Sequence, residues 1–142
     1  WPGTLQPREV KVPCVSSDYF PTISAIAAVP LAQRPYDGIN ILPILRGTIS
    51  QRNQSIGFRF GKDSTLVTDR YKLVHNAGGL SRRRSDNGKV PVRKFELYDL
   101  EADPSETQNI ATDSPEVTTR MKSDLLAFIK SCKASAEGSD YR

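Results

Sequence analysis

Few residues in this sequence could do chemistry, and the first of them is the only histidine, His75. One histidine cannot provide a histidine metal cluster or two-histidine acid–base catalysis. It follows Tyr71 and Leu73 at a spacing of two, on the same face of an expected strand, which is typical of a sheet residue. A place at the rim of a substrate cleft is the other interpretation. No Ser-His-Asp set, phosphate-binding glycine loop or zinc spacing is recognisable. We therefore expect no catalytic residue in this chain.

The second group is a run of three arginines, Arg82, Arg83 and Arg84, in a basic loop flanked by glycines. The chain carries a net charge of +4, and this loop holds much of it. The loop is either a solvated hairpin or a site for an anionic polymer. No aromatic residue lies between Tyr71 and Phe95, so the stacking platform that nucleic-acid binding favours is absent. We expect no nucleic-acid partner, whereas an anionic polysaccharide stays open.

The two cysteines, Cys14 and Cys132, lie too far apart for a CxxC redox or metal pair. A bridge between them would close a loop of more than 100 residues. In the chain-entropy model such a bridge is worth about 4 to 5 kcal/mol. Two buried free thiols are the alternative, because cysteine is among the most buried residue types.

The elements that must position these residues follow from hydrophobic spacing. Short β-prone runs, in which large apolar residues mostly alternate with other residues, predict four antiparallel strands. These runs are Ile56 to Phe60, the segment around Leu66 and Val67, Tyr71 to His75, and the segment that begins at Phe95. Ser114-Pro115-Glu116 is a helix start, and an apolar stripe predicts a helix over 114–132. After Cys132 the pattern stops, which predicts a frayed tail.

Before the strands, the sequence predicts a helix over 18–29 and an apolar segment over 39–45. Pro43 argues against a central strand in that segment, and residues 10–12 suit a short strand at best. No apolar run approaches the roughly 20 residues of a membrane helix, so no membrane partner is expected. The opening Trp1-Pro2-Gly3 is neither a start methionine nor a signal peptide, and we expect a piece of a longer protein.

Five motifs in order along the chain resemble the C-terminal portion of the sulfatase family, which is arylsulfatase-like and part of the alkaline phosphatase superfamily. They are W-P-G at 1–3, S-D-x-x-P-T-I at 17–23, Y-D-G-I-x-I-L-P-I-L at 36–45, D-R-Y-K-L-V at 69–74, and E-L-Y-D-L followed by D-P-x-E-x-x-N at 96–109. The resemblance implies an α+β fold, with a small antiparallel sheet of about four strands packed by the C-terminal helix. It implies that 1–50 is the last strand and helix remnant of a catalytic α/β domain and 51–142 the C-terminal subdomain.

The resemblance also implies chemistry that lies elsewhere. Sulfatases hydrolyse sulfate esters with a formylglycine made from a C/S-x-P-x-R motif, and they bind a divalent metal, usually calcium. Cys14 is followed by Val-Ser-Ser-Asp and does not match that motif. Asp86-Asn87-Gly88 lies downstream of W-P-G, whereas the family's metal pair lies upstream, so a β-turn is the better interpretation. We therefore expect this chain to contain no catalytic and no metal-binding residue. We expect His75, Arg82, Arg83 and Arg84 to lie at the rim of the substrate cleft.

The expected protein is thus a sulfatase fragment that is inactive alone and whose partners are the missing N-terminal catalytic region and a sulfated small molecule or polysaccharide. A periplasmic, secreted or lysosomal-type compartment is expected from the resemblance. The helix from Asp18 and the segment 39–45 are expected to expose apolar surface, which would favour self-association or a disordered N-terminal third. Two alternatives stay open: a related phosphonate or phosphate ester hydrolase, and a non-catalytic module that binds acidic polysaccharide through Arg82 to Arg84.

Overall fold

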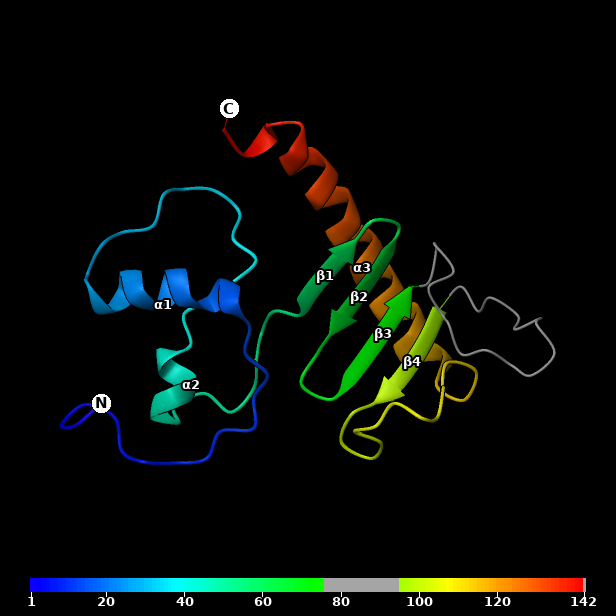
Figure 1. Cartoon of the computed structure of the whole chain (residues 1–142), viewed down its shortest axis with the longest axis horizontal. Coiled ribbons are helices and arrows are strands. Elements are labelled where there is room, and N and C mark those ends of the chain that lie inside the picture. The colour runs from blue at the N-terminus through cyan, green and yellow to red at the C-terminus, as the bar shows by residue number, and fades with distance from the viewer. Residues whose placement is uncertain (76–94, 142) are drawn as a thin grey trace.

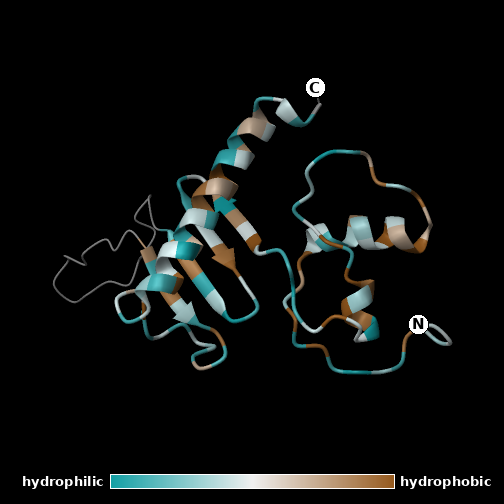
Figure 2. Cartoon of the chain, turned by 180° about the vertical axis from the view of Figure 1, so that it is seen from behind, coloured by the Kyte–Doolittle hydropathy of each residue, from teal (hydrophilic) through white to brown (hydrophobic). Residues whose placement is uncertain are grey.

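The computed structural model describes residues 1–75 and 95–141. An N-terminal region holds a 3-10 turn η1 (Ser16–Asp18) and two helices, α1 (Tyr19–Ile26) and α2 (Leu42–Arg46). Four strands follow, β1 (Ile56–Phe60), β2 (Asp63–Val67), β3 (Tyr71–His75) and β4 (Phe95–Asp99). The long helix α3 (Pro115–Ala136) and a 3-10 turn η2 (Ser139–Tyr141) end the described chain. The N-terminal helices lie beside the sheet, and α3 crosses one of its faces (Figures 1 and 2).

The sheet is an antiparallel meander in the order β1-β2-β3-β4, which confirms the four predicted strands and the α+β class. Leu66, Leu73 and Leu97 are in register and form one apolar row across the sheet. Met121 and Leu125 of α3 pack onto this row, and the five side chains form the buried core cluster between the sheet and the helix. The predicted stripe on the helix and the period of two in the strands therefore meet at one interface (Figure 2).

Gly57 continues this row onto the edge strand β1, where it lies opposite Leu66. A Cβ atom at Gly57 would lie 2.6 Å from the Phe128 ring, so only glycine lets α3 approach the sheet this closely. Because side chains alternate along a strand, Phe58 and Phe60 point to the opposite face, and they are 49% and 80% exposed. The face of the sheet away from α3 thus carries apolar side chains at the β1 edge.

The segment after β4 protects the other edge of the sheet. The Asn109 side-chain oxygen accepts hydrogen bonds from the Leu97 and Ala111 N–H groups at 3.1 and 3.0 Å. The Ile110 N–H donates to the Leu97 carbonyl at 2.8 Å, so both backbone groups of Leu97 at this edge are paired. Glu106 has φ 55° and binds the ammonium group of Lys72 with both carboxylate oxygens.

Several predicted boundaries change. The helix predicted over 18–29 ends at Ile26, and Ala28 has φ 54°, which breaks it before Pro30. The segment over 39–45 contains helix α2, with Pro43 in its first turn, where a missing N–H costs nothing. Residues 10–12 form no strand. The final helix runs to Ala136, so the tail predicted from residue 133 begins later.

The remaining structural predictions concern the cap of α3, the two cysteines and a membrane-spanning helix. Ser114 precedes α3 as predicted, but its side chain makes no capping hydrogen bond; its carbonyl accepts the Thr118 hydroxyl at 2.9 Å. Cys14 and Cys132 are both free thiols, so the bridge is not formed. Burial raises the pKa of each thiol, although Cys14 is more exposed than the buried-thiol alternative predicted. Among the described residues, no helix has the length and apolar character that crossing a membrane requires.

Candidate functional site

The predicted rim residue His75 occupies the last position of β3. Its ring stacks on Phe95 of β4, with ring centroids 4.6 Å apart and an interplanar angle of 19°. The two residues are paired in register, and the ammonium group of Lys122 from α3 lies 5.0 Å from the centre of the Phe95 ring. His75 therefore packs at the end of the sheet on the α3 side. Arg82, Arg83 and Arg84, and the turn predicted at 86–88, lie outside the described residues, so the rim itself stays a prediction.

Within residues 1–75 and 95–141, no three His, Cys, Asp or Glu side chains gather closely enough to hold a metal ion. The thiol of Cys14 donates to the Val12 carbonyl at 3.5 Å and is exposed, and Cys132 lies on α3. These residues do not fit a formylglycine–calcium centre.

The most strongly organised polar group in the described chain is a buried ion pair between Asp18 and Arg52. Both side chains are almost inaccessible, at 0% and 1% exposure. The guanidinium donates from Nη1 to Oδ2 and from Nη2 to Oδ1, each at 2.8 Å, which is the bidentate geometry that arginine favours with carboxylates. The Val15 and Ile39 N–H groups also donate to the carboxylate, both at 2.9 Å. The Asp18 carboxylate is therefore fully hydrogen-bonded inside the protein.

Arg52 also ties the N-terminal region to the sheet. Its Nε donates to the Gln54 carbonyl at 2.6 Å, and its backbone N–H donates to Asp69, in the β2–β3 turn, at 3.0 Å. The Gln54 side chain in turn donates to the carbonyls of Tyr36 and Asp37. Residues that are far apart in sequence thus meet at one node, which we call the Arg52 node, made of Asp18, Arg52, Gln54 and Asp69.

The electrostatics of the Arg52 node follow from its geometry. Burial alone would raise the pKa of Asp18, but the hydrogen bonds from Arg52, Ile39 and Val15 and the positive charge of Arg52 outweigh it and hold the pKa below its ordinary value. The ion pair is therefore charged at neutral pH. Its role is to hold two parts of the chain together, because both partners are fully used by each other and by the backbone.

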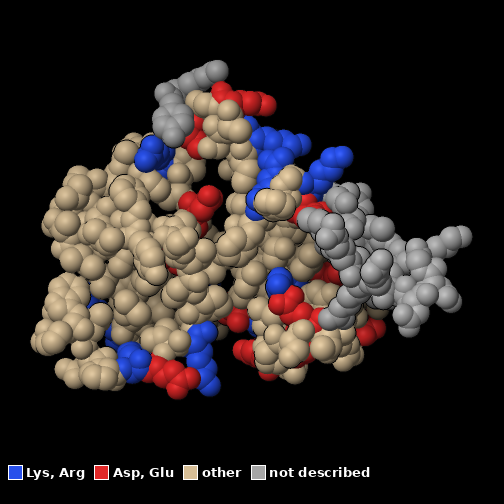
Figure 3. Space-filling model, viewed as in Figure 1, with Lys and Arg blue, Asp and Glu red and all other residues tan. Residues whose placement is uncertain are grey.

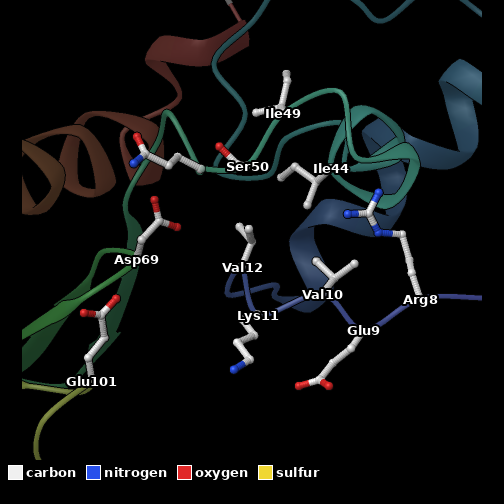
Figure 4. A pocket seen from close by; sticks show the side chains of 11 residues that line it. Arg8, Glu9, Val10, Lys11, Val12, Ile44, Ile49, Ser50, Asp69 and Glu101 are labelled. Carbon is white, nitrogen blue, oxygen red and sulfur yellow. The ribbon is translucent and has the colours of Figure 1, made fainter.

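A surface groove of about 310 Å³ lies beside this node, between the N-terminal segment and the sheet (Figure 4). Asp69 and Glu101 lie on its sheet side, and Arg8, Glu9 and Lys11 lie on the opposite side. Figure 3 shows hollows between the N-terminal region and the rest of the molecule. Charges of both signs line the groove, so it favours neither an anion nor a cation. The described residues that line it form no metal cluster.

Comparison with known proteins gives a consistent set of relatives, although no family model matches the chain. It is 29% identical to human arylsulfatase A over 86% of this chain and 28% of that protein. It is 30% identical to rat arylsulfatase K over 93% of this chain and 24% of that protein. An N-acetylgalactosamine-6-O-sulfatase from Bacteroides thetaiotaomicron is 24% identical over 92% of the chain and 26% of its own length. The chain thus spans about a quarter of the length of these relatives.

Solved structures share the fold. A putative sulfatase from Bacteroides fragilis superposes with a TM-score of 0.63 and 20% identity, over 92% of this chain and 28% of that one. A Bacteroides thetaiotaomicron protein, described with the metabolism of multiple glycosaminoglycans, gives a TM-score of 0.55 and 26% identity over 82% of this chain and 24% of that one. The four-stranded sheet with its C-terminal helix is therefore a known arrangement.

Proposed function

Because this chain is related to the sulfatases along almost its whole length, we propose that it is the C-terminal part of an enzyme that hydrolyses sulfate esters. One observation carries the proposal: sulfatases match 86 to 93% of this chain but use only 24 to 28% of their own length to do so. The described residues also bring no three His, Cys, Asp or Glu side chains together as a metal site. Both facts fit a protein in which this chain has a structural role and the catalytic residues lie in the rest of the polypeptide.

In this proposal, residues 1–50 end the catalytic α/β domain and residues 51–142 form the C-terminal subdomain. The formylglycine and the calcium ion would be held by residues outside this chain, since Cys14 lacks the required motif and the described residues offer no metal cluster. His75 and Arg82 to Arg84 would line the substrate rim. A sulfated small molecule or polysaccharide is the proposed substrate, and a periplasmic, secreted or lysosomal-type compartment is the proposed location.

The experiment is to express the whole reading frame that contains this chain and to compare turnover of an aryl sulfate, an aryl phosphate and a phosphonate monoester. The proposal expects the sulfate ester to have the highest kcat/KM. A preference for the phosphate or the phosphonate would instead assign the protein to the related hydrolases that the sequence left open.

The rim is tested in the same protein with a triple variant, Arg82→Ala, Arg83→Ala and Arg84→Ala. The expected result is a higher KM for a sulfated polysaccharide and an unchanged kcat for a small aryl sulfate, because the lost charges contact only the extended substrate. The matched control removes three exposed charges from α3, with Arg120→Ala, Lys130→Ala and Lys133→Ala. If the two triple variants changed the KM for the polysaccharide equally, the proposed place of the arginines at the substrate rim would be wrong.

A further inference from the structure

Helix α1 exposes its apolar side and buries its polar side. Its buried residues are Pro21, Thr22 and Ser24. Its large apolar side chains point outward: Tyr19 is 64%, Phe20 54%, Ile23 61% and Ile26 46% exposed. A surface helix of a globular protein shows the reverse arrangement, with the apolar stripe facing the core. The side chains Tyr19, Phe20, Ile23 and Ile26 are called the outer face of α1 from here on.

Hydrogen bonds fix this orientation of α1. The Thr22 hydroxyl donates to the Asp18 carbonyl at 2.6 Å and accepts the Ile41 N–H at 3.1 Å. The backbone of Gly38 passes so close to Ser17 that a side chain at Gly38 would overlap the Ser17 carbonyl. Asp18, which precedes the helix, is held by the Arg52 node. The helix therefore cannot rotate its apolar side inward without breaking buried polar contacts.

The chemistry of the outer face indicates what would cover it. From Tyr19 to Gln33 the sequence contains no charged residue, and in Figure 3 the surface over α1, at the left, is almost free of Lys, Arg, Asp and Glu. An exposed apolar patch without charges favours an apolar protein surface over an anionic lipid surface, for which a helix carries many basic residues. In each relative, about three quarters of the polypeptide lies outside the matched part, and the corresponding polypeptide here would provide such a surface.

We propose that this chain is about a quarter of a longer protein of sulfatase length, and that the outer face of α1 packs against an apolar surface of the remaining polypeptide. This inference rests on the proposed function in one respect, the existence of that polypeptide. The covered helix then belongs to the interior of the whole protein, and the Arg52 node sets its distance and orientation to the sheet.

The test measures thiol accessibility in the protein made from the whole reading frame, after Cys14→Ser and Cys132→Ser remove the two thiols of this chain. The labelled fraction is measured by mass spectrometry on the peptide that carries position 23 or 123, so that other thiols of the whole protein do not contribute. One variant carries Ile23→Cys, and the control carries Ser123→Cys on the exposed side of α3. Both are labelled with a maleimide reagent at a concentration at which light scattering shows a monomer. The expected result is that Ile23→Cys reacts about tenfold or more slowly than Ser123→Cys in the whole protein. The two sites should react at similar rates in the 142-residue chain.

Equal labelling of the two sites in the monomeric whole protein would overturn the inference. Protection that appears only at concentrations where the whole protein dimerises would assign the face to a second copy, and protection only on phosphatidylcholine–phosphatidylserine vesicles would assign it to lipid; either result overturns the proposal. A reading frame with no further polypeptide would overturn it too. Since labelling does not depend on turnover, protection without sulfatase activity would reject the proposed function and keep the interface.

Discussion

Replacing Arg52 by methionine tests the role of the Arg52 node most severely. Methionine keeps much of the side-chain volume but removes both guanidinium bonds to Asp18, a carboxylate with 0% exposure. Removing one partner of a buried ion pair typically costs about 3 to 5 kcal/mol, because the other charge is left without compensation. Total stabilities of domains are about 5 to 15 kcal/mol, so Arg52→Met should remove a large share of the free energy of unfolding.

The assay is urea unfolding of the 142-residue chain, followed by circular dichroism, with the slope m compared between variants. Arg70→Met is the matched control, because the Arg70 side chain is half exposed and pairs with Asp99 at the surface, where a much smaller change is expected. The double variant Asp18→Asn with Arg52→Met should recover part of the loss, since the amide leaves no stranded charge. A midpoint for Arg52→Met equal to that of Arg70→Met would refute the reasoning.

Three further predictions concern the sheet and the pH response. Gly57→Val should lower the free energy of unfolding by about 1 to 3 kcal/mol, because Phe128 must move, and an unchanged urea midpoint would contradict this. Asn109→Ala should cost about 1 to 3 kcal/mol by leaving the Leu97 N–H without its acceptor, whereas Asn109→Asp keeps an acceptor and should cost less. The lowered pKa of Asp18 means that its stabilising contribution is complete above the unfolded pKa of about 3.9 and is lost as the pH falls through the folded pKa. Acid titration should therefore destabilise Asp18→Asn less steeply than the unmodified chain, and equal slopes would oppose this.

The strands and the closing helix could be predicted because their burial is one-sided. Leu66, Leu73 and Leu97 stand in a period of two, and Met121 and Leu125 lie on one helical stripe, so each pattern reports the face that packs. The end of α3 was placed too early because residues 133–136 lack apolar periodicity, although they can extend a helix that is already formed.

The Arg52 node could not be predicted from the sequence. The two charges of its buried ion pair, Asp18 and Arg52, are 34 residues apart, and a single arginine in a polar loop carries no signal that it is buried. The S-D-x-x-P-T-I motif contains Asp18, which starts the helix predicted over 18–29, and that motif was the one available hint. The sequence also could not show which side of α1 faces inward, because hydrogen bonds through Thr22, rather than apolar burial, set that orientation.

The most direct test of the central claim is the turnover of an aryl sulfate by the purified 142-residue chain in the presence of calcium. The account predicts no hydrolysis above the buffer rate, because Cys14 lacks the C/S-x-P-x-R motif and the described residues contain no metal cluster. The same assay on the protein from the whole reading frame should show turnover that is lost when this chain is deleted. Hydrolysis by the 142-residue chain alone at ordinary enzyme rates, about 1 to 1,000 per second, would contradict the account.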